Sequence, residues 1–204
     1  MARASKKDQI LDRGMRAVRR TGLVGSSVRD ITAAAEVPLG SFGNHFASKE
    51  AFGLAVIDHY FAGVREIVAA TLDDTSRPPL ARLRAYFDEI TDRLERRGWH
   101  DGCLIGNTSL DSTETSEAIR VRLSEVFAEW HEPFARCLLE AERVGEVTLP
   151  LPALGFADFL MASWQGAMLR MKVERSPEPL ERFKTVVFDA LLAPRRTPTN
   201  ERNR

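Results

Sequence analysis

Apolar residues recur at intervals of three and four along most of the chain, which is the spacing of one face of an α-helix. Prolines, glycines and short polar runs such as residues 73–79 interrupt this spacing and mark the ends of the segments. The segments predicted as helices include residues 5–21, 28–35, 38–46, 48–72, 80–97, 114–144, 153–174 and 178–192. Because no segment alternates as a strand does, we predict an all-α fold of about nine helices, with a head of three helices and a larger C-terminal bundle.

Residues 26–50 contain the most specific local pattern of the chain. Ser26 and Ser27 are suited to cap a helix, because a side-chain hydroxyl accepts a hydrogen bond from a free amide of its first turn. Pro38 ends that helix and suits the first position of the next one, since its missing N–H costs nothing there. Two short helices joined by a tight turn predict a helix-turn-helix, whose second helix enters the major groove of DNA.

The second of these helices, residues 38–46, is expected to present two faces. The inward face is apolar and comprises Leu39, Phe42 and Phe46. The outward face carries groups that hydrogen-bond to bases or phosphates and comprises Ser41, Asn44 and His45, while Gly40 allows a close approach of the backbone to a phosphate. The candidate DNA-binding residues are Ser27, Arg29, Pro38, Leu39, Gly40, Ser41, Phe42, Asn44, His45 and Lys49.

The same stretch resembles the DNA-binding segment of the TetR family of one-component transcriptional regulators. The family pattern runs from T/S-x-x-x-I-A-x-x-A-G-V, through a short helix ending in Y-x-H-F, to the helix start S-K-E-x-L. The matching residues here are Val28, Ile31, Ala34, Val37, Gly40, Ser41, Phe42, His45, Phe46, Ser48, Lys49 and Glu50. The resemblance implies a ligand-responsive repressor that a small-molecule effector releases from a pseudo-palindromic double-stranded DNA operator.

Three positions depart from the family pattern. Glu36 replaces the glycine of the turn, Phe42 stands where a tyrosine is usual, and Gly43 stands where a large side chain is common. A glycine inside a helix costs about 1 kcal/mol relative to alanine, so we expect the affinity for DNA to be modest.

Charge is unevenly distributed, although the chain as a whole is neutral with 29 basic and 29 acidic residues. Residues 1–49 carry nine basic and four acidic side chains, a net charge of +5, which leaves −5 for the remainder. An ordinary solvated face gives a similar pattern, but together with the helix-turn-helix the basic segment favours contact with DNA phosphates.

These features divide the chain into three parts. Residues 1–50 are predicted to be the DNA-binding domain, residues 51–193 a ligand-binding and dimerisation domain, and residues 194–204 a disordered polar tail. We expect a cytoplasmic protein without membrane contact, because no apolar run approaches about 18 residues and the basic N-terminus lacks a signal-peptide core. The two cysteines have no zinc-type spacing, so we predict neither a metal site nor a cofactor.

The last two predicted helices, about 153–174 and 178–192, are more apolar than a monomer needs. Small residues mixed with methionine, such as Ala157, Met161 and Gly166, permit close contact between helices. The family resemblance implies a homodimer held by these two helices of each subunit. A place in the internal core is the alternative for each of these residues.

A second unusual segment is Gly102-Cys103-Leu104-Ile105-Gly106-Asn107. It resembles the Gly-Cys-Leu-x-x-Asn segment of one branch of the TetR family, which includes electrophile-sensing repressors and places the segment at the base of the effector pocket. The resemblance implies that Cys103 faces such a pocket, where a thiolate would be the reactive form. An inert core residue is the alternative, and it is also our expectation for Cys137.

An effector pocket in the larger bundle is expected to be mostly apolar with a few placed polar groups. The candidate pocket residues are Phe87, Trp99, Cys103, Asn107, Phe127, Trp130, His131, Phe134, Trp164, Gln165 and Met168. An ordinary place in the core is the alternative for each aromatic side chain.

Two other functions stay open at this point. A cysteine-dependent enzyme would use Cys103 as nucleophile and His100 or His131 as base, but no phosphate loop, metal cluster or nucleophile elbow supports it. An activator that binds DNA without any effector would carry the same helix-turn-helix. We predict a regulator and not an enzyme.

Overall fold

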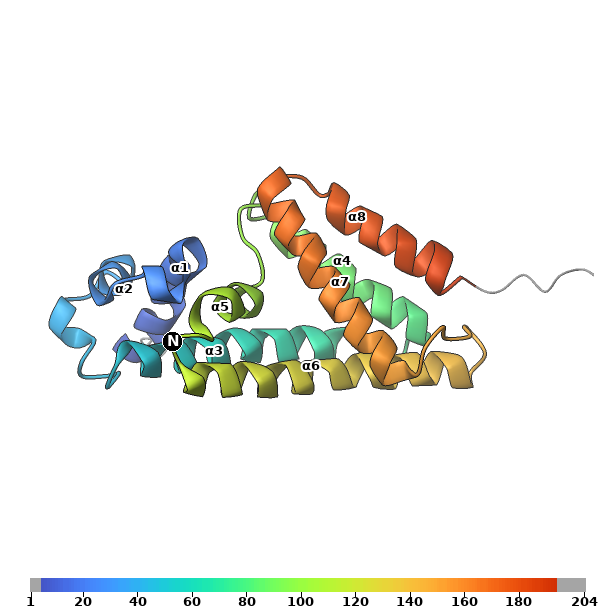
Figure 1. Cartoon of the computed structure of the whole chain (residues 1–204), viewed down its shortest axis with the longest axis horizontal. Coiled ribbons are helices and arrows are strands. Elements are labelled where there is room, and N and C mark those ends of the chain that lie inside the picture. The colour runs from blue at the N-terminus through green and yellow to red at the C-terminus, as the bar shows by residue number, and fades with distance from the viewer. Residues whose placement is uncertain (1–4, 194–204) are drawn as a thin grey trace, which may run out of the picture.

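A computed structural model describes residues 5–193 of the chain (Figure 1). The α-helices are α1 (Lys6–Gly25), α2 (Val28–Ala34), α3 (Lys49–Ala70), α4 (Pro79–Glu95), α5 (Leu104–Ser112), α6 (Glu117–Arg143), α7 (Ala153–Glu174) and α8 (Glu178–Thr185). A 3-10 turn, η1 (Leu39–Ser41), follows α2, and a π-helical segment, η2 (Val186–Leu191), continues α8. The prediction of an all-α fold is confirmed for this part of the chain, which contains no strand.

Figure 1 shows α1 and α2 in a head at one end of an elongated molecule, with the later helices forming the body. α3 begins at the head and runs beside α6 along the body. α5 lies between head and body, where it contacts α1, α3 and α6. α4 and α7 pack on α6, and α8 packs on both α4 and α7. The predicted arrangement of a small head and a larger helical bundle is confirmed.

Serine caps fix the starts of several helices. Ser48 accepts a hydrogen bond from the backbone N–H of Ala51 at 3.0 Å, and α3 therefore starts where the sequence predicted. α6 starts at Glu117, later than the predicted residue 114, and the hydroxyl of its cap Ser116 accepts from the N–H of Ile119 at 3.1 Å.

The predicted second helix of the helix-turn-helix, residues 38–46, is wrong as a regular α-helix. Only the 3-10 turn η1 forms, followed by turns, and Pro38 is extended with ψ of 144°. A 3-10 turn has about three residues per turn, so the side chains rotate away from the faces expected for an α-helix. Leu39 is consequently 52% exposed and Ser41 is buried, the reverse of the orientation predicted for them.

Two further differences concern the ends of segments. Residues 99–111 were not predicted as a helix, yet α5 forms from Leu104 to Ser112. The first predicted helix ends at residue 21, and Gly22 does adopt a positive φ of 78°, but helical turns resume after it and α1 extends to Gly25. The predicted tail, residues 194–204, lies outside the described residues.

One apolar core runs through head and body. In the head, the rings of Phe42, Phe46 and Phe52 lie 5.2 to 5.6 Å apart by their centroids. Further along α3, Phe61 packs edge-on against Trp130 of the body at 5.8 Å. α3 therefore carries core residues of both parts. Across residues 5–193, no helix has the combination of length and apolar character that a membrane span requires.

Candidate DNA-binding head and effector cavity

The start of α2 is fixed by two reciprocal hydrogen bonds between Ser27 and Asp30. The N–H of Asp30 donates to the Ser27 hydroxyl oxygen at 3.1 Å, and the N–H of Ser27 donates to the Asp30 carboxylate at 2.9 Å. This capping box satisfies amides that the helix leaves free. The hydrogen bond from the Ser27 hydroxyl lowers the pKa of Asp30 below its usual value.

The turn after α2 is built around Glu36, whose φ of 56° lies in the left-handed region. A glycine adopts this conformation without strain, which explains why the family pattern has glycine here. The turn is tied to α1 by two contacts: the Gln9 side-chain amide donates to the carbonyl of Ala35 at 2.9 Å, and Arg13 pairs with the Glu36 carboxylate.

The candidate DNA-binding residues differ in their exposure to solvent. Six are exposed: Ser27, Arg29, Pro38, Leu39, Gly40 and Asn44. His45 and Lys49 are half-buried, whereas Ser41 and Phe42 are buried and support the head from inside. Asn44 and His45 follow η1 in the turn that leads to Phe46, so their polar groups stand at the surface of the head.

Lys49 has a structural contact that the sequence did not predict. Its ammonium donates to the backbone carbonyl of Val24, in the last turn of α1, at 2.8 Å. A lysine ammonium has three donors, so this contact leaves two that can still meet a phosphate.

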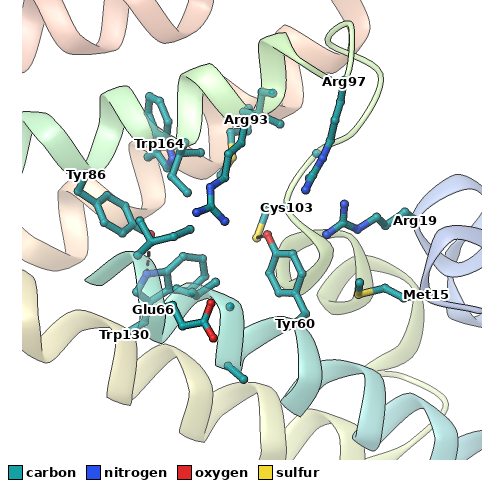
Figure 2. Close-up of a pocket in the computed structure, with 18 of the residues that line it drawn as sticks. Met15, Arg19, Tyr60, Glu66, Tyr86, Arg93, Arg97, Cys103, Trp130 and Trp164 are labelled. Carbon is teal, nitrogen blue, oxygen red and sulfur yellow. Dashed lines mark hydrogen bonds between the residues drawn. The ribbon is translucent and has the colours of Figure 1, made fainter. Parts of the chain in front are cut away.

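The body contains a cavity of about 520 Å³. α3, α4 and α7 contribute to its wall, Cys103 lies at its centre in the close-up, and Met15 and Arg19 enter it from the head helix α1 (Figure 2). The labelled lining residues are Met15, Arg19, Tyr60, Glu66, Tyr86, Arg93, Arg97, Cys103, Trp130 and Trp164. The lining of the cavity therefore includes both aromatic side chains and a group of arginines.

Arg19 and Arg97 share one carboxylate, that of Asp101. Its Oδ2 lies 3.3 Å from an Nη of Arg19 and 3.9 Å from an Nη of Arg97. Arg19 also stacks over the ring of Tyr60, with 5.3 Å between its guanidinium carbon and the ring centroid. Burial and the charge of Arg19 together lower the pKa of Arg97.

Two tyrosines bring hydroxyl groups to the cavity. The Tyr60 hydroxyl donates to the sulfur of Cys103 at 3.8 Å, and burial together with this neighbour raises the pKa of Tyr60. The Tyr86 hydroxyl accepts from the indole N–H of Trp130 at 2.9 Å, and burial raises the pKa of Tyr86 as well. Both phenols are therefore neutral at physiological pH.

The predicted pocket residues fall into three groups. Cys103, Trp130, Trp164 and Met168 line the cavity. Asn107 and Gln165 line an adjoining hollow of about 210 Å³, which Cys103 and Met168 also border. The remaining candidates do not line either space: Phe87, Trp99, Phe127, His131 and Phe134.

Each residue of the last group has another role. Phe87 and Phe134 are fully buried and pack on Tyr86, with ring centroids 5.6 and 4.8 Å away. Phe127 stacks beside Trp130, and the Nδ1 of His131 lies 2.7 Å from the Asp158 carboxylate. The Trp99 carbonyl accepts from Arg175 at 3.2 Å.

Sequence reasoning missed the charged part of the cavity. Arg93 and Arg97 stand four residues apart, and neither of them was given a role from the sequence. Their spacing places both on one side of α4 and the turn after it, which was the available signal. The participation of Arg19 depends on the packing of α1 against the body, and no local pattern reveals it.

Comparison with known proteins agrees with this architecture. Residues 79–187 match the family model described as "Tetracyclin repressor-like, C-terminal domain". The chain is 45% identical over 201 residues to the HTH-type transcriptional repressor DhaR of Mycobacterium sp. (strain GP1), covering 98% of this chain and 100% of that protein.

Two crystal structures extend the similarity to three dimensions. A regulatory protein TetR from Rhodobacter sphaeroides has a TM-score of 0.85 at 31% identity, covering 91% of this chain and 97% of that one. Reduced NemR of E. coli has a TM-score of 0.84 at 27% identity, covering 94% and 99%.

A head in which a short helix, a tight turn and the 3-10 turn η1 follow one another, set on a helical body with its own cavity, is the architecture of a one-component transcriptional regulator. The chain belongs to the TetR family. Regulators of this family bind DNA operators and act as dimers.

Proposed function

We propose that this protein is a repressor that binds a pseudo-palindromic operator as a dimer and leaves it when a small-molecule effector fills the body cavity. The observation that carries the proposal is that the head helix α1 supplies Arg19 to the wall of a cavity in the body. A ligand in that cavity touches the head directly. The names of the relatives DhaR and NemR, both transcriptional repressors, support repression over activation.

α5 offers a second connection between the cavity and the head. It begins directly after Cys103 at the cavity, and near its other end Asp111 accepts a hydrogen bond from the N–H of Val24 in α1. A ligand switches such a protein only if it binds one position of the head more tightly than the other. Within the proposed division at residue 50, α3 is the lever that belongs to both parts.

The head meets DNA through its exposed polar groups. Asn44 and His45 are suited to base edges, and Arg29 and Lys49 to phosphates. Two heads of a dimer would read half-sites about one helical turn apart. An operator-binding protein works in the compartment that holds the DNA, in agreement with the cytoplasmic location expected from the sequence.

The dimer interface proposed here consists of α7 together with α8 and η2. Large apolar side chains stay exposed on these elements in the single chain: Leu154, Phe159, Leu169, Val173 and Val186. Two of them, Phe159 and Val186, line a hollow of about 270 Å³ between α7 and α8 with η2, which side chains of a partner helix would fill. Phe159→Glu should therefore give monomers in sedimentation, while Val121→Glu, an exposed apolar position on α6, should leave the dimer intact. If Phe159→Glu still forms dimers with the dimerisation affinity of the wild type, the interface lies elsewhere.

A cysteine-dependent enzyme is not supported. The hydrogen bond recorded at the Cys103 sulfur within residues 5–193 comes from Tyr60 and not from a histidine, and His131 is engaged by Asp158. Nucleophilic catalysis by a cysteine needs a nearby base that takes its proton. At 4% exposed, Cys103 is compatible with both the sensing and the inert interpretation.

A footprint of the purified protein on the DNA flanking its own gene tests the proposal. At two salt concentrations, a protected pseudo-palindrome whose protection fades with salt is the expected result. A footprint that no candidate effector removes would favour a regulator without a ligand. Absence of protection there and in an unbiased selection of binding sites would overturn the proposal.

A further inference from the structure

The arginines of the cavity carry more positive charge than the nearby carboxylates balance. Arg19 and Arg97 face the single carboxylate of Asp101, while Arg93 pairs separately with Glu89 on its own helix at 2.6 Å. Glu66 also lines the cavity, but it lies beside Trp130, on the side away from Arg19 and Arg97 (Figure 2). One guanidinium charge of the Arg19 and Arg97 pair is thus without a close anion within the described residues.

Arg19 is the most confined of these cations, since only 13% of its side chain is exposed. Its Nε is buried and has no hydrogen-bond partner within residues 5–193. A buried donor without an acceptor is costly, and a buried charge more so, unless a ligand supplies the missing partner. The side chain of Arg97 is 42% exposed, and partial burial together with the charge of Arg19 lowers its pKa, so the confined cation is Arg19 and not Arg97.

The opposite part of the wall is mainly aromatic, with Glu66 beside Trp130 (Figure 2). Tyr86, Trp130 and Trp164 border it with their rings, and the Tyr86 hydroxyl is already satisfied by Trp130. Figure 2 shows these rings on one side of Cys103 and the guanidinium of Arg19 on the other. The space therefore suits a molecule with an apolar body and one anionic end.

We propose that the effector is a small monocarboxylate with an apolar body, and that its carboxylate displaces Asp101 from Arg19 and Arg97. The inference rests on the proposed function, because it names the effector class of the same cavity. A carboxylate matches the planar fork of a guanidinium and accepts charge-assisted hydrogen bonds from it. In the structure the carboxylate of Asp101 holds this place between the two guanidinium groups.

The displacement links ligand binding to the position of the head. Arg19 belongs to α1, whereas Arg97 and Asp101 belong to the turn between α4 and α5. When the carboxylate of the ligand binds Arg19, the ion pair between Arg19 of α1 and Asp101 is lost. The contact between head and body then runs through the ligand. A neutral molecule in the same cavity would leave the Arg19–Asp101 pair in place.

Calorimetric titration of the purified full-length protein without DNA tests this assignment. The probes are two acids and their amides: 3-phenylpropionate with 3-phenylpropanamide, and hexanoate with hexanamide. We expect each acid to bind at least about tenfold more tightly than its amide, because the amide lacks the charge that a guanidinium requires. Equal binding within both pairs, or no binding of either acid, would overturn the proposal.

Variants separate the roles of the charged groups. Arg19→Gln and Arg97→Gln should abolish the preference for acid over amide, while Arg20→Gln and Arg96→Gln, exposed neighbours outside the cavity lining, should keep it. Asp101→Asn should strengthen binding of both acids several-fold and leave the amides unchanged, since it removes the competing carboxylate. Unchanged acid affinity in Asp101→Asn would overturn the displacement. This variant keeps the test decisive even where Arg19→Gln fails to fold.

Failure of this inference and failure of the proposed function look different. A protein that prefers the acids but protects no DNA contradicts the repressor function and leaves the ligand class standing. A protein that releases its operator to neutral molecules, with no preference for the acids, keeps the repressor function and removes the ligand class.

Discussion

The backbone N–H of Val24, in the last turn of α1, donates to the Oδ2 of Asp111 in α5 at 3.3 Å. This hydrogen bond joins the head to the helix that starts at the cavity. It depends on the backbone of Gly22, which has φ of 78° and ψ of 166° and brings Val24 against α5. That region of backbone space is essentially restricted to glycine.

Gly22→Ala should therefore weaken the junction of head and body. A Cβ at this position would fall 2.3 Å from the Asp111 Oδ2, so the carboxylate has to leave Val24. Strain of the backbone and the lost hydrogen bond together predict a loss of about 2 kcal/mol in the free energy of unfolding. Urea denaturation at fixed protein concentration measures it. Gly25→Ala is the matched control, because its Cβ meets only Thr21 at 3.7 Å and its stability should not fall.

Glu36 offers the opposite experiment. Its positive φ strains any residue with a Cβ, so Glu36→Gly should be more stable than Glu36→Ala by about 1 kcal/mol. Both variants lose the exposed ion pair with Arg13, so the difference between them reports the backbone alone. Comparing the thermal melting temperatures of the two variants measures this difference in stability. If Glu36→Ala melts at the same temperature as Glu36→Gly or above it, the turn is not strained at this position.

The outlines of the fold were readable from local sequence because local interactions set them. Ser27 and Ser48 cap the helices predicted to begin near residues 28 and 48, and α7 has the predicted bounds, since serine caps, proline and apolar spacing define them within a few residues. The prediction of an α-helix over residues 38–46 was wrong for a local reason too. With glycine at positions 40 and 43, the segment is too short and too flexible for a regular α-helix.

The site was less predictable because it depends on contacts between distant segments. Arg19 and Asp101 are 82 residues apart in sequence and meet only because α1 packs near the turn after α4. Phe87 and Phe134 have the same apolar character as Trp130 and Trp164, yet only the latter two border the cavity. Which side of a buried aromatic ring faces an empty space is decided by neighbours from other helices.

Asn44 and His45 are predicted to read the operator. Asn44→Ala and His45→Ala should each weaken operator binding about tenfold, because a lost hydrogen bond to a base edge is worth about 1 to 3 kcal/mol. Fluorescence anisotropy with a labelled operator gives the dissociation constants, and sedimentation shows whether the dimer persists. Wild-type affinity in both variants would move recognition away from this part of the head.

Arg29 and Lys49 should contribute to affinity through phosphates. Arg29→Gln is expected to reduce the slope of log affinity against log salt by about 1, with stability unchanged, because Arg29 is exposed. Lys49→Gln should reduce the slope in the same way and also lower stability, since it breaks the hydrogen bond to Val24. Arg143→Gln, at the end of α6, should have neither effect. A wild-type slope in Lys49→Gln would show that its role is confined to the head.

Cys137 is predicted to make stability depend on pH in the alkaline range. Its thiol donates to the carbonyl of Pro79 at 3.1 Å, and burial raises its pKa from 9.0 to about 11. The folded state therefore holds the thiol proton more tightly than the unfolded state. This stabilisation is complete below pH 9 and is lost as the pH rises from 9 towards 11.

The size of the loss follows from the shift in pKa. Between pH 8 and pH 10.5 the wild type should lose about 2 kcal/mol more unfolding free energy than Cys137→Ala, which has no thiol to titrate. Urea denaturation of both proteins at the two pH values, at one protomer concentration, measures this difference. The variant is less stable throughout because of the cavity it creates, but that penalty cancels in the comparison. Parallel losses in the two proteins would mean that the Cys137 thiol is as free to ionise in the folded chain as in the unfolded one.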